Sequence, residues 1–325
     1  MHLIAIGGRD IAEHLGVDES IALVEKAMRA LSGGETRQLL RRIMPVPGGP
    51  GMVGDMVGSL GASSAFGLKC VSVFPGELTG RPSHRGAVLL FEPSIGEPVA
   101  LIEAGLLTAI RTAAASAFAT RLLARDDART LGILGAGEQA ARHIPALLRV
   151  RPFEQVRIWS RNPQRARGLI GETALPAGVA LDVVGSPREA AAADVICTLT
   201  SASEPVLEGA WVRPGTHVNL VGSSHAGACE ADEALVASAR YFVDSEESAR
   251  AQAAEFLRAR AAGAVSDGHM LGEIGAVANG ALPGRLSDRD ITVYKSLGSI
   301  VQDLACGWYL YEQSRRLGFG TPIEL

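Results

Sequence analysis

A glycine-rich turn between an apolar run and a helix-compatible stretch is the strongest chemical signal in this sequence. The apolar run Thr130–Leu134 meets the turn Gly135-Ala136-Gly137-Glu138-Gln139-Ala140, and helix-compatible residues follow through Leu148. This order matches the G-x-G-x-x-G/A fingerprint of a dinucleotide site. The first glycine permits a tight turn, the second lets a pyrophosphate approach the backbone, and free N–H groups at the helix start face the anion. The predicted contacts to a nicotinamide or flavin dinucleotide are Gly135, Gly137, Glu138 and Gln139.

The end of the next expected strand bears on which nicotinamide dinucleotide binds. NAD-binding units usually place an acidic residue there, where it holds the ribose 2′-hydroxyl. Here the run Val156–Ser160 is followed by Arg161-Asn162-Pro163, and no carboxylate is present. Hydroxyl, amide and guanidinium groups can instead bind a 2′-phosphate, although the alternative for Arg161 is a surface turn. We predict NADP(H) in preference to NAD(H), with contacts from Ser160, Arg161 and Asn162.

Two threonines stand near the end of a further strand-like run, Val195–Thr200. In open parallel sheets, ligands bind beyond the carboxyl ends of the strands. We therefore expect Thr198 and Thr200 to border the ribose or the nicotinamide, although two threonines on a strand are commonplace.

Three cationic residues lie in surroundings that are otherwise apolar or small. Lys69 lies within a strand-like run, Arg111 interrupts an alanine-rich helical stretch, and Arg41 precedes a second strand-like run. A buried charge needs a partner, and a substrate carboxylate held by two guanidinium groups would supply one. The alternatives are that Arg111 pairs with Glu103 or another neighbour and that Arg41 is exposed to solvent.

Lys69 has the strongest claim to a catalytic role among these cations. A partly desolvated lysine near two arginines has a lowered pKa and can exchange a proton with a substrate nitrogen. His84, which we place among the substrate-binding candidates, and His225 are further choices because a neutral imidazole titrates in a useful range. A lone histidine is more often a loop residue or a structural hydrogen-bonding group.

Length and composition indicate a well-buried globular protein of about two domains. The chain has 325 residues, of which 47 % are hydrophobic and 20 % are charged, as in ordinary folded domains. The net charge of −4 and the lack of a Lys/Arg stripe argue against a nucleic-acid partner.

Cysteine usage and hydropathy favour a reducing compartment away from membranes. The four cysteines are scattered, with no C-x-x-C pair and no histidine at zinc spacing, so we expect buried thiols and no metal site. The most apolar region, Leu101–Leu123, contains Glu103, Arg111 and Arg121 and is therefore not expected to span a membrane. The N-terminal residues lack the basic start and long apolar core of a signal peptide. We expect a cytoplasmic location.

The order of patterns along the chain predicts an α/β protein. After short strand-like runs, a regular alternation of strands and helices begins at Thr130. Such alternation is typical of a Rossmann-type, doubly wound parallel sheet. The expected helices are Val17–Leu31, Ala104–Ala124, Glu246–Ala262 and Val293–Leu317, and the expected strands are Arg42–Val46, Phe66–Phe74, Ala87–Phe91, Thr130–Leu134, Val156–Ser160, Ala180–Val184, Val195–Thr200, His217–Gly222 and Tyr241–Asp244.

Five segments spread over nearly the whole chain share their residues, order and spacing with one known family. They are Gly67-Leu68-Lys69, Thr108-Ala109-Ile110-Arg111-Thr112-Ala113-Ala114, Gly135-Ala136-Gly137-Glu138-Gln139-Ala140, Gly215-Thr216-His217-Val218-Asn219 with Val221-Gly222, and Ile291-Thr292-Val293-Tyr294-Lys295-Ser296-Leu297-Gly298. On these segments the chain resembles the ornithine cyclodeaminase/mu-crystallin family.

The resemblance implies a homodimer with a discontinuous α+β domain for dimerisation and substrate binding. Residues 1–112 and 294–325 would form that domain, and residues 113–293 would form the inserted Rossmann-type dinucleotide-binding domain. The resemblance also implies roles for single residues. They are Arg41 (with Arg37 and Arg42 as rivals) and Arg111 for the substrate carboxylate, Lys69 as the active-site lysine, Thr112 as a pyrophosphate contact, and Val221, Lys295, Ser296 and Gly298 as further cofactor contacts.

The chain departs from the cyclodeaminase pattern at one position. Cyclodeaminases of the family carry an aspartate two residues after the glycine that matches Gly222, where it activates the amine or water, and Ser224 stands in that place. A serine hydroxyl cannot serve as a carboxylate base near neutral pH. We therefore expect Ser224 in the catalytic site of an enzyme that does not cyclise ornithine.

The resemblance then favours NAD(P)H-dependent reduction of a small cyclic 2-imino acid. The substrate would be 1-pyrroline-2-carboxylate or 1-piperideine-2-carboxylate, and the product L-proline or L-pipecolate. The rivals are ornithine cyclodeaminase, an alanine dehydrogenase or opine-type imine reductase, and a non-catalytic mu-crystallin-like binder. The binder is disfavoured because Lys69, both arginines and the glycine turn are retained.

Overall fold

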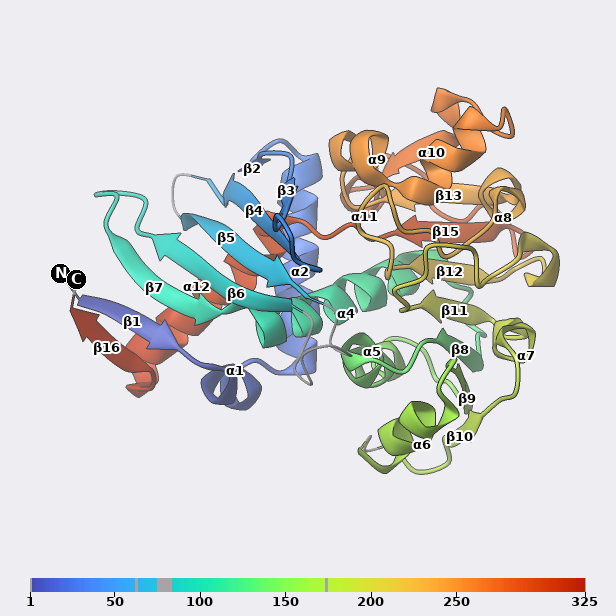
Figure 1. The fold of residues 1–325 in the computed structure, drawn as a ribbon, viewed down its shortest axis with the longest axis horizontal. Coiled ribbons are helices and arrows are strands. Elements are labelled where there is room, and N and C mark those ends of the chain that lie inside the picture. The colour runs from blue at the N-terminus through green and yellow to red at the C-terminus, as the bar shows by residue number, and fades with distance from the viewer. Residues whose placement is uncertain (1, 62–63, 75–83, 173–174, 325) are drawn as a thin grey trace. The chain divides into compact units, whose positions relative to one another are not determined.

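The computed structural model describes residues 2–61, 64–74, 84–172 and 175–324 (Figure 1). By its internal contacts the chain separates into a first unit, residues 1–111 with 299–325, and a second unit, residues 112–298. These limits lie close to the expected domain limits of 112/113 and 293/294. The division into functional domains stays a prediction.

The first unit is built on a mixed sheet of eight described strands. They are β1 (His2–Ile6), β2 (Arg37–Gln38), β3 (Arg42–Pro45), β4 (Met52–Ser59), β5 (Phe66–Val73), β6 (His84–Phe91), β7 (Pro98–Glu103) and β16 (Thr321–Glu324). The strand order is β16-β1-β7-β6-β5-β4-β2, and β3 also pairs with β4. Only β1 and β7 run parallel, whereas the other described pairs are antiparallel. The two ends of the chain thus meet in one sheet.

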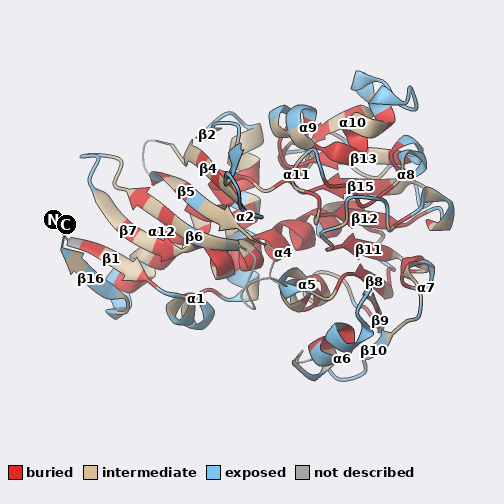
Figure 2. Ribbon diagram, viewed as in Figure 1, coloured by how far each residue is buried: buried red, intermediate tan, exposed pale blue. Residues whose placement is uncertain are grey.

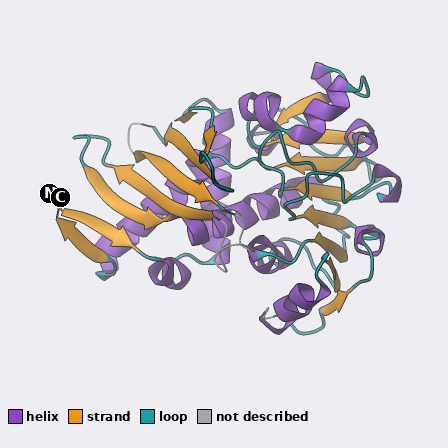
Figure 3. Cartoon of the chain, viewed as in Figure 1, coloured by secondary structure: helices purple, strands orange, loops and turns teal. Residues whose placement is uncertain are grey.

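The described helices of this unit are α1 (Gly8–His14), α2 (Val17–Ser32) and α12 (Ile300–Leu317), together with α4 (Ala104–Leu123) up to Arg111. Helix α12 packs against β4, β5 and β6, and α2 packs against α12 (Figure 3). The apolar residues Ile21, Val24 and Met28 recur at helical spacing on α2 and are buried, so this amphipathic helix forms as predicted.

The second unit is built on a parallel sheet of eight described strands. They are β8 (Thr130–Leu134), β9 (Gln155–Trp159), β10 (Ala180–Val183), β11 (Val195–Thr198), β12 (His217–Leu220), β13 (Ala239–Val243), β14 (Met270–Glu273) and β15 (Ile291–Lys295). The order is β10-β9-β8-β11-β12-β15-β13-β14, and each described pair is parallel. The predicted α/β fold, a Rossmann-type sheet beside a second α+β unit, is confirmed.

Helices connect these strands across both faces of the sheet. They are α5 (Glu138–Leu148), α6 (Pro163–Glu172), α7 (Pro187–Ala191), α8 (Glu233–Ser238), α9 (Glu246–Gln252), α10 (Ala254–Ala261) and α11 (Ile274–Ala278), with short 3₁₀ helices at Gly209–Trp211 and Asp267–His269. Two apolar clusters form, one containing Ile133 and Ile144 and the other Ile196 and Phe256. Strands β11 and β12 are buried at every position (Figure 2), as expected of parallel strands covered on both faces.

Two predicted helices are present but have other limits than expected. The predicted terminal helix Val293–Leu317 begins only at Ile300, because Val293–Lys295 belongs to strand β15, which pairs with β12 and β13. An apolar β-branched run has no helical signature of its own, and Gly298, at φ +83°, separates it from the helix that begins at Ile300. The second helix, Glu246–Ala262, breaks at Ala253, whose ψ of 90° is extended rather than helical.

The cysteine prediction also needs one correction. Three of the four thiols are buried and free, but Cys70 is exposed. Side chains alternate along a strand, so Cys70 takes the face opposite to that of the buried Lys69. Among the described residues, no helix combines the length and apolar character that crossing a membrane requires.

Candidate active site

In the first unit, Lys69 meets a buried carboxylate that comes from the far end of the chain. Its Nζ donates a hydrogen bond to Oδ1 of Asp303 at 2.8 Å, and the two side chains are 3 % and 0 % exposed. Lys69 also donates to the hydroxyl of Thr108 on α4, and that hydroxyl donates to the carbonyl of Ala104. The predicted active-site lysine is therefore held by two helices, α4 and α12.

Arg111 binds the same carboxylate oxygen. Its Nε donates to Oδ1 of Asp303 at 3.1 Å, and its Nη1 donates to Oε1 of Gln302 at 2.9 Å. The suggested partner Glu103 instead accepts hydrogen bonds from the N–H groups of Gly105 and Leu106 at the start of α4. One oxygen of Asp303 thus joins the cations of β5 and α4.

Arg41 lies half-buried immediately before β3, near enough for its charge to lower the pKa of Lys69. Its two sequence rivals have other partners. Arg42 is exposed and pairs with Asp55 on β4, and Arg37 donates to the carbonyls of neighbouring residues. The structure therefore brings Arg41, Lys69 and Arg111 into one cluster, and their roles toward a substrate stay a prediction.

The electrostatics of this cluster favour an anionic ligand. Burial lowers the pKa of Lys69 to about 8, and the charges of Arg111 and Arg41 act in the same direction, whereas Asp303 opposes them. Burial alone would raise the pKa of Asp303, but Arg111 and Lys69 hold it below its usual range. With Lys69 protonated, the two cations Lys69 and Arg111 share one carboxylate oxygen. A carboxylate would reduce this imbalance.

The two histidine candidates belong to different units of the chain. His84 begins β6, but its side chain lies outside the described residues. His225 accepts a hydrogen bond from the N–H of Gly227 at 3.1 Å, which is a local loop contact.

In the second unit, the glycine turn has the geometry that a dinucleotide requires. Gly135 follows β8 with φ +116°, and a Cβ there would lie 2.5 Å from the carbonyl oxygen of Leu199. Gly137 precedes the first turn of α5, and a Cβ on it would meet nothing within 4 Å. The turn therefore leaves open space in front of a helix N-terminus, where a pyrophosphate can bind backbone N–H groups.

The end of β9 forms an exposed turn without a carboxylate. The N–H of Asn162 donates to Oγ of Ser160 at 3.3 Å, and Oδ1 of Asn162 accepts from the N–H of Gln164 at the start of α6. Arg161 is exposed between them. This arrangement leaves a guanidinium at the position where a ribose-binding acid would stand, and contact with a 2′-phosphate stays a prediction.

A buried glutamate that the sequence analysis missed, Glu230, accepts hydrogen bonds from residues at the carboxyl ends of β11 and β12. Glu230 accepts hydrogen bonds from the hydroxyls of Thr198 and Thr200 at 2.7 Å and from the N–H groups of Thr200 and Gly222 at 2.6 Å. Burial raises its pKa. The two threonines predicted to border the cofactor thus direct their hydroxyls to Glu230.

A second buried carboxylate, Glu255, pairs with Lys295 at 3.0 Å, and both side chains are fully buried. Lys295 also donates to the carbonyl of Ser223, and the hydroxyl of Ser223 donates to Glu255. Lys295 therefore directs its ammonium group into the core, and its expected cofactor role stays untested. The same holds for Thr112, Val221 and Ser296, which are buried, and for Gly298, whose N–H donates to Asp244. Ser224 is half-buried, and its expected place in the catalytic site stays untested as well.

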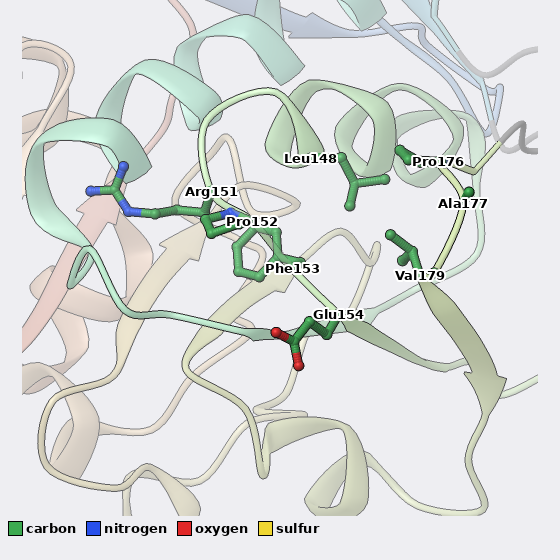
Figure 4. A pocket seen from close by; sticks show the side chains of 9 residues that line it. Leu148, Arg151, Pro152, Phe153, Glu154, Pro176, Ala177 and Val179 are labelled. Atoms are coloured by element: carbon green, nitrogen blue, oxygen red, sulfur yellow. The ribbon is translucent and has the colours of Figure 1, made fainter.

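A surface hollow of about 310 Å³ in the second unit lies elsewhere (Figure 4). Its lining residues include Leu148, Phe153 and Val179. Phe153 lies just before β9, and Val179 lies just before β10. The hollow therefore lies at the amino ends of the parallel strands, at the edge opposite to the glycine turn. Ligands of such sheets bind at the carboxyl edge.

The parallel sheet and its glycine turn place the chain in the class of NAD(P)-dependent oxidoreductases. A family model takes the assignment one step further. The model described as "Ornithine cyclodeaminase/mu-crystallin family" matches residues 6–317, and the chain belongs to this family. The resemblance found in the sequence is thereby confirmed.

Individual members of the family are similar over most of their length. The ketimine reductase mu-crystallin of Mus musculus is 37 % identical over 284 residues, which are 86 % of each chain. The structure of Thermococcus litoralis Delta(1)-pyrroline-2-carboxylate reductase with NADH and L-proline has a TM-score of 0.95, at 33 % identity, and the match covers 99 % of this chain and 100 % of that one. An archaeal alanine dehydrogenase dimer with bound NAD has a TM-score of 0.93 at 28 % identity, with full coverage of both chains.

Proposed function

We propose that this enzyme reduces a small cyclic 2-imino acid, 1-pyrroline-2-carboxylate or 1-piperideine-2-carboxylate, to L-proline or L-pipecolate with NAD(P)H. The observation that carries the proposal is the buried cluster of Lys69, Arg111 and Asp303, with the charge of Arg41 nearby. Its excess positive charge suits one carboxylate, and its lysine suits a basic nitrogen. The names of the mouse and Thermococcus relatives support the same chemistry.

In the proposed reaction each side chain has a separate task. Arg41 and Arg111 hold the substrate carboxylate, and Lys69, or a water that it orients, keeps the imine nitrogen protonated. The bound nicotinamide supplies the hydride for the imine carbon, so that one proton and one hydride enter for each imine reduced. Most of the acceleration comes from positioning and from charge complementarity.

The titration of Lys69 predicts a pH dependence. Because burial lowers its pKa to about 8, Lys69 is mainly protonated below that pH and loses its proton above it. We expect kcat/KM for imine reduction to fall as the pH rises through about 8. The effect is measured as a profile of kcat/KM between about pH 6 and 10 at saturating NADPH. This range covers both the protonated and the neutral form of Lys69. A rate that stays constant up to pH 10 would exclude Lys69 as the proton donor.

The dinucleotide is held by the glycine turn, and we propose that it is NADP(H) in preference to NAD(H). The support is the turn after β9, where Arg161 is present and a ribose-binding acid is not. The residues proposed for the rest of the cofactor site are Thr112, Gly135, Gly137, Glu138, Gln139, Ser160, Asn162, Thr198, Thr200, Val221, Lys295, Ser296 and Gly298.

Replacing Arg161 by alanine tests this preference. We expect NADPH binding to weaken by roughly 1–3 kcal/mol, because a charge-assisted bond to the 2′-phosphate is lost, while NADH binding stays nearly unchanged. Quenching of tryptophan fluorescence by each dinucleotide gives both dissociation constants. Equal losses for the two dinucleotides would show that Arg161 contacts the adenine or supports the fold instead.

We further propose a homodimer that works in the cytoplasm. The alanine dehydrogenase of similar fold was solved as a dimer. In the first unit, Leu39, Ile43 and Met44 are large apolar side chains with 65 %, 38 % and 59 % of their surface exposed, and contact with a second copy of the chain would bury apolar surface of this kind. Light scattering during gel filtration gives the oligomeric state, and a monomer at micromolar concentration would contradict the proposal.

A substrate screen tests the proposed reaction. NADPH and NADH oxidation is followed with pyrroline-2-carboxylate, with piperideine-2-carboxylate, and with pyruvate plus ammonia. We expect loss of the 340 nm absorbance with one or both cyclic imines. Turnover with pyruvate and ammonia alone would instead identify an alanine dehydrogenase, the function of the second similar structure.

A further inference from the structure

We propose that Asp303 is a positioning residue, whose oxygen Oδ1 sets the spacing of Lys69 and Arg111 and keeps the lysine charged. The inference rests on the proposed function of the same site. Oδ1 lies 2.8 Å from Nζ of Lys69 and 3.1 Å from Nε of Arg111. The side chain of Asp303 is 0 % exposed, so water does not screen these contacts.

The geometry joins three elements that are distant in the sequence. Lys69 lies on β5, Arg111 on α4, and Asp303 in the first turn of α12. The neighbouring Gln302 accepts from Nη1 of Arg111, so this one turn of α12 fixes the guanidinium at two nitrogens. The hydroxyl of Ser299 accepts a hydrogen bond from the N–H of Val301 and donates one to Gln38. The turn that carries Asp303 is thereby held to the sheet.

The charges around Lys69 show why Asp303 matters for its proton. Helix α4 presents Thr108 and Arg111, the segment before β3 presents Arg41, and α12 presents Asp303. On the flanking strands β4 and β6, the residues in register with Lys69 are Met56 and Val88, which carry no charge. Asp303 is therefore the only negative charge found against Lys69 in the described part of the chain.

The second oxygen of Asp303 supports this assignment. Oδ2 is buried, and no hydrogen-bond donor reaches it among the described residues. Within the described ranges, the charge of the carboxylate is therefore partnered by Lys69 and Arg111 alone. If the charge of Asp303 is removed, Lys69 and Arg111 are left together without it, and of these two cations only the lysine can lose its proton.

The variant Asp303→Asn separates charge from shape, because asparagine keeps the volume and the Oδ1 acceptor. We expect the alkaline fall of kcat/KM for imine reduction to move to lower pH by roughly 1–3 pH units. Activity at pH 7.5 should drop by about 3- to 200-fold, the range that such a shift from a pKa of about 8 gives, and should recover as the buffer is made more acidic. Because all variants use the same imine, ionisation of the substrate cancels from the comparison.

Three further variants and one binding measurement complete the test. Asp55→Asn removes the partner of the exposed Arg42 in the same unit and should leave the profile unmoved. Asp303→Glu restores the charge and should return the alkaline fall to its wild-type pH, with a lower rate from altered spacing. Thr108→Val removes a neutral acceptor of Lys69 and should move the profile less than Asp303→Asn does. NADH affinity reports whether the second unit is intact.

The outcomes distinguish the inference from the function on which it rests. A uniform loss of activity in Asp303→Asn at every pH, with the alkaline fall in its wild-type place, would assign Asp303 to the fold alone. If Asp303→Asn does not fold, a profile of Asp303→Glu displaced to lower pH would overturn the inference, and a wild-type profile would support it. Failure of the wild-type enzyme to reduce any cyclic imine at any pH would instead overturn the proposed function.

Discussion

Replacing Lys69 by methionine is expected to lower kcat for imine reduction by about 10²–10⁴-fold while the dinucleotide still binds, because a positioned proton donor is lost. Methionine has a similar length but carries no proton. Steady-state rates with a cyclic imine give kcat and KM, and fluorescence titration gives the NADPH affinity.

The matched control for this variant is Lys26→Met. Lys26 is exposed on α2 in the same unit, and its replacement should change kcat by less than about twofold, as surface substitutions usually do. If Lys69→Met raises only KM, then Lys69 binds substrate and the proton comes from another group, with His84 next in line.

Replacing Arg111 by glutamine should act mainly on substrate binding. The substrate carboxylate loses a charge-assisted hydrogen bond of roughly 1.5–3 kcal/mol, so kcat/KM should fall by about 10–150-fold, chiefly through KM. Arg111 also shares Asp303 with Lys69, and thermal unfolding must therefore accompany the kinetics.

Arg42→Gln provides the comparison for this second variant. Arg42 was a rival for the carboxylate site in the sequence, and it is exposed and paired with Asp55 in the structure. Its replacement should leave KM within about twofold of the wild-type value. A rise in KM that equals that of Arg111→Gln would transfer the carboxylate-binding role to Arg42.

Local patterns in the sequence were sufficient for much of the fold. The run Thr130–Leu134 is strand β8 with the same limits, and Gly135 makes the predicted tight turn at φ +116°. Both features depend on neighbouring residues only. Strand β15 was missed because it does not depend on local sequence in this way. Its place between β12 and β13 is determined by pairing within the sheet.

The partners of the candidate site residues were the least predictable part. Asp303 lies 234 residues after Lys69 in the sequence. Its local sequence is that of an ordinary polar position on an amphipathic helix and gives no sign of a partner. Glu230 lies between Cys229 and Ala231 in the sequence, and both of these neighbours are buried. A carboxylate between buried residues was the one available signal for it. Which cation or hydroxyl it meets depends on tertiary packing.

We propose that the enzyme reduces an imine and does not cyclise ornithine, and that Ser224 is the residue at which the two reactions diverge. A serine hydroxyl cannot accept a proton near neutral pH as an aspartate does. The decisive measurement incubates the enzyme with L-ornithine and NAD⁺ and follows ammonia, and in parallel follows NADPH with a cyclic 2-imino acid. We expect negligible ammonia from ornithine and one NADPH oxidised for each imine reduced. Robust ammonia release from ornithine without net consumption of dinucleotide would contradict the account.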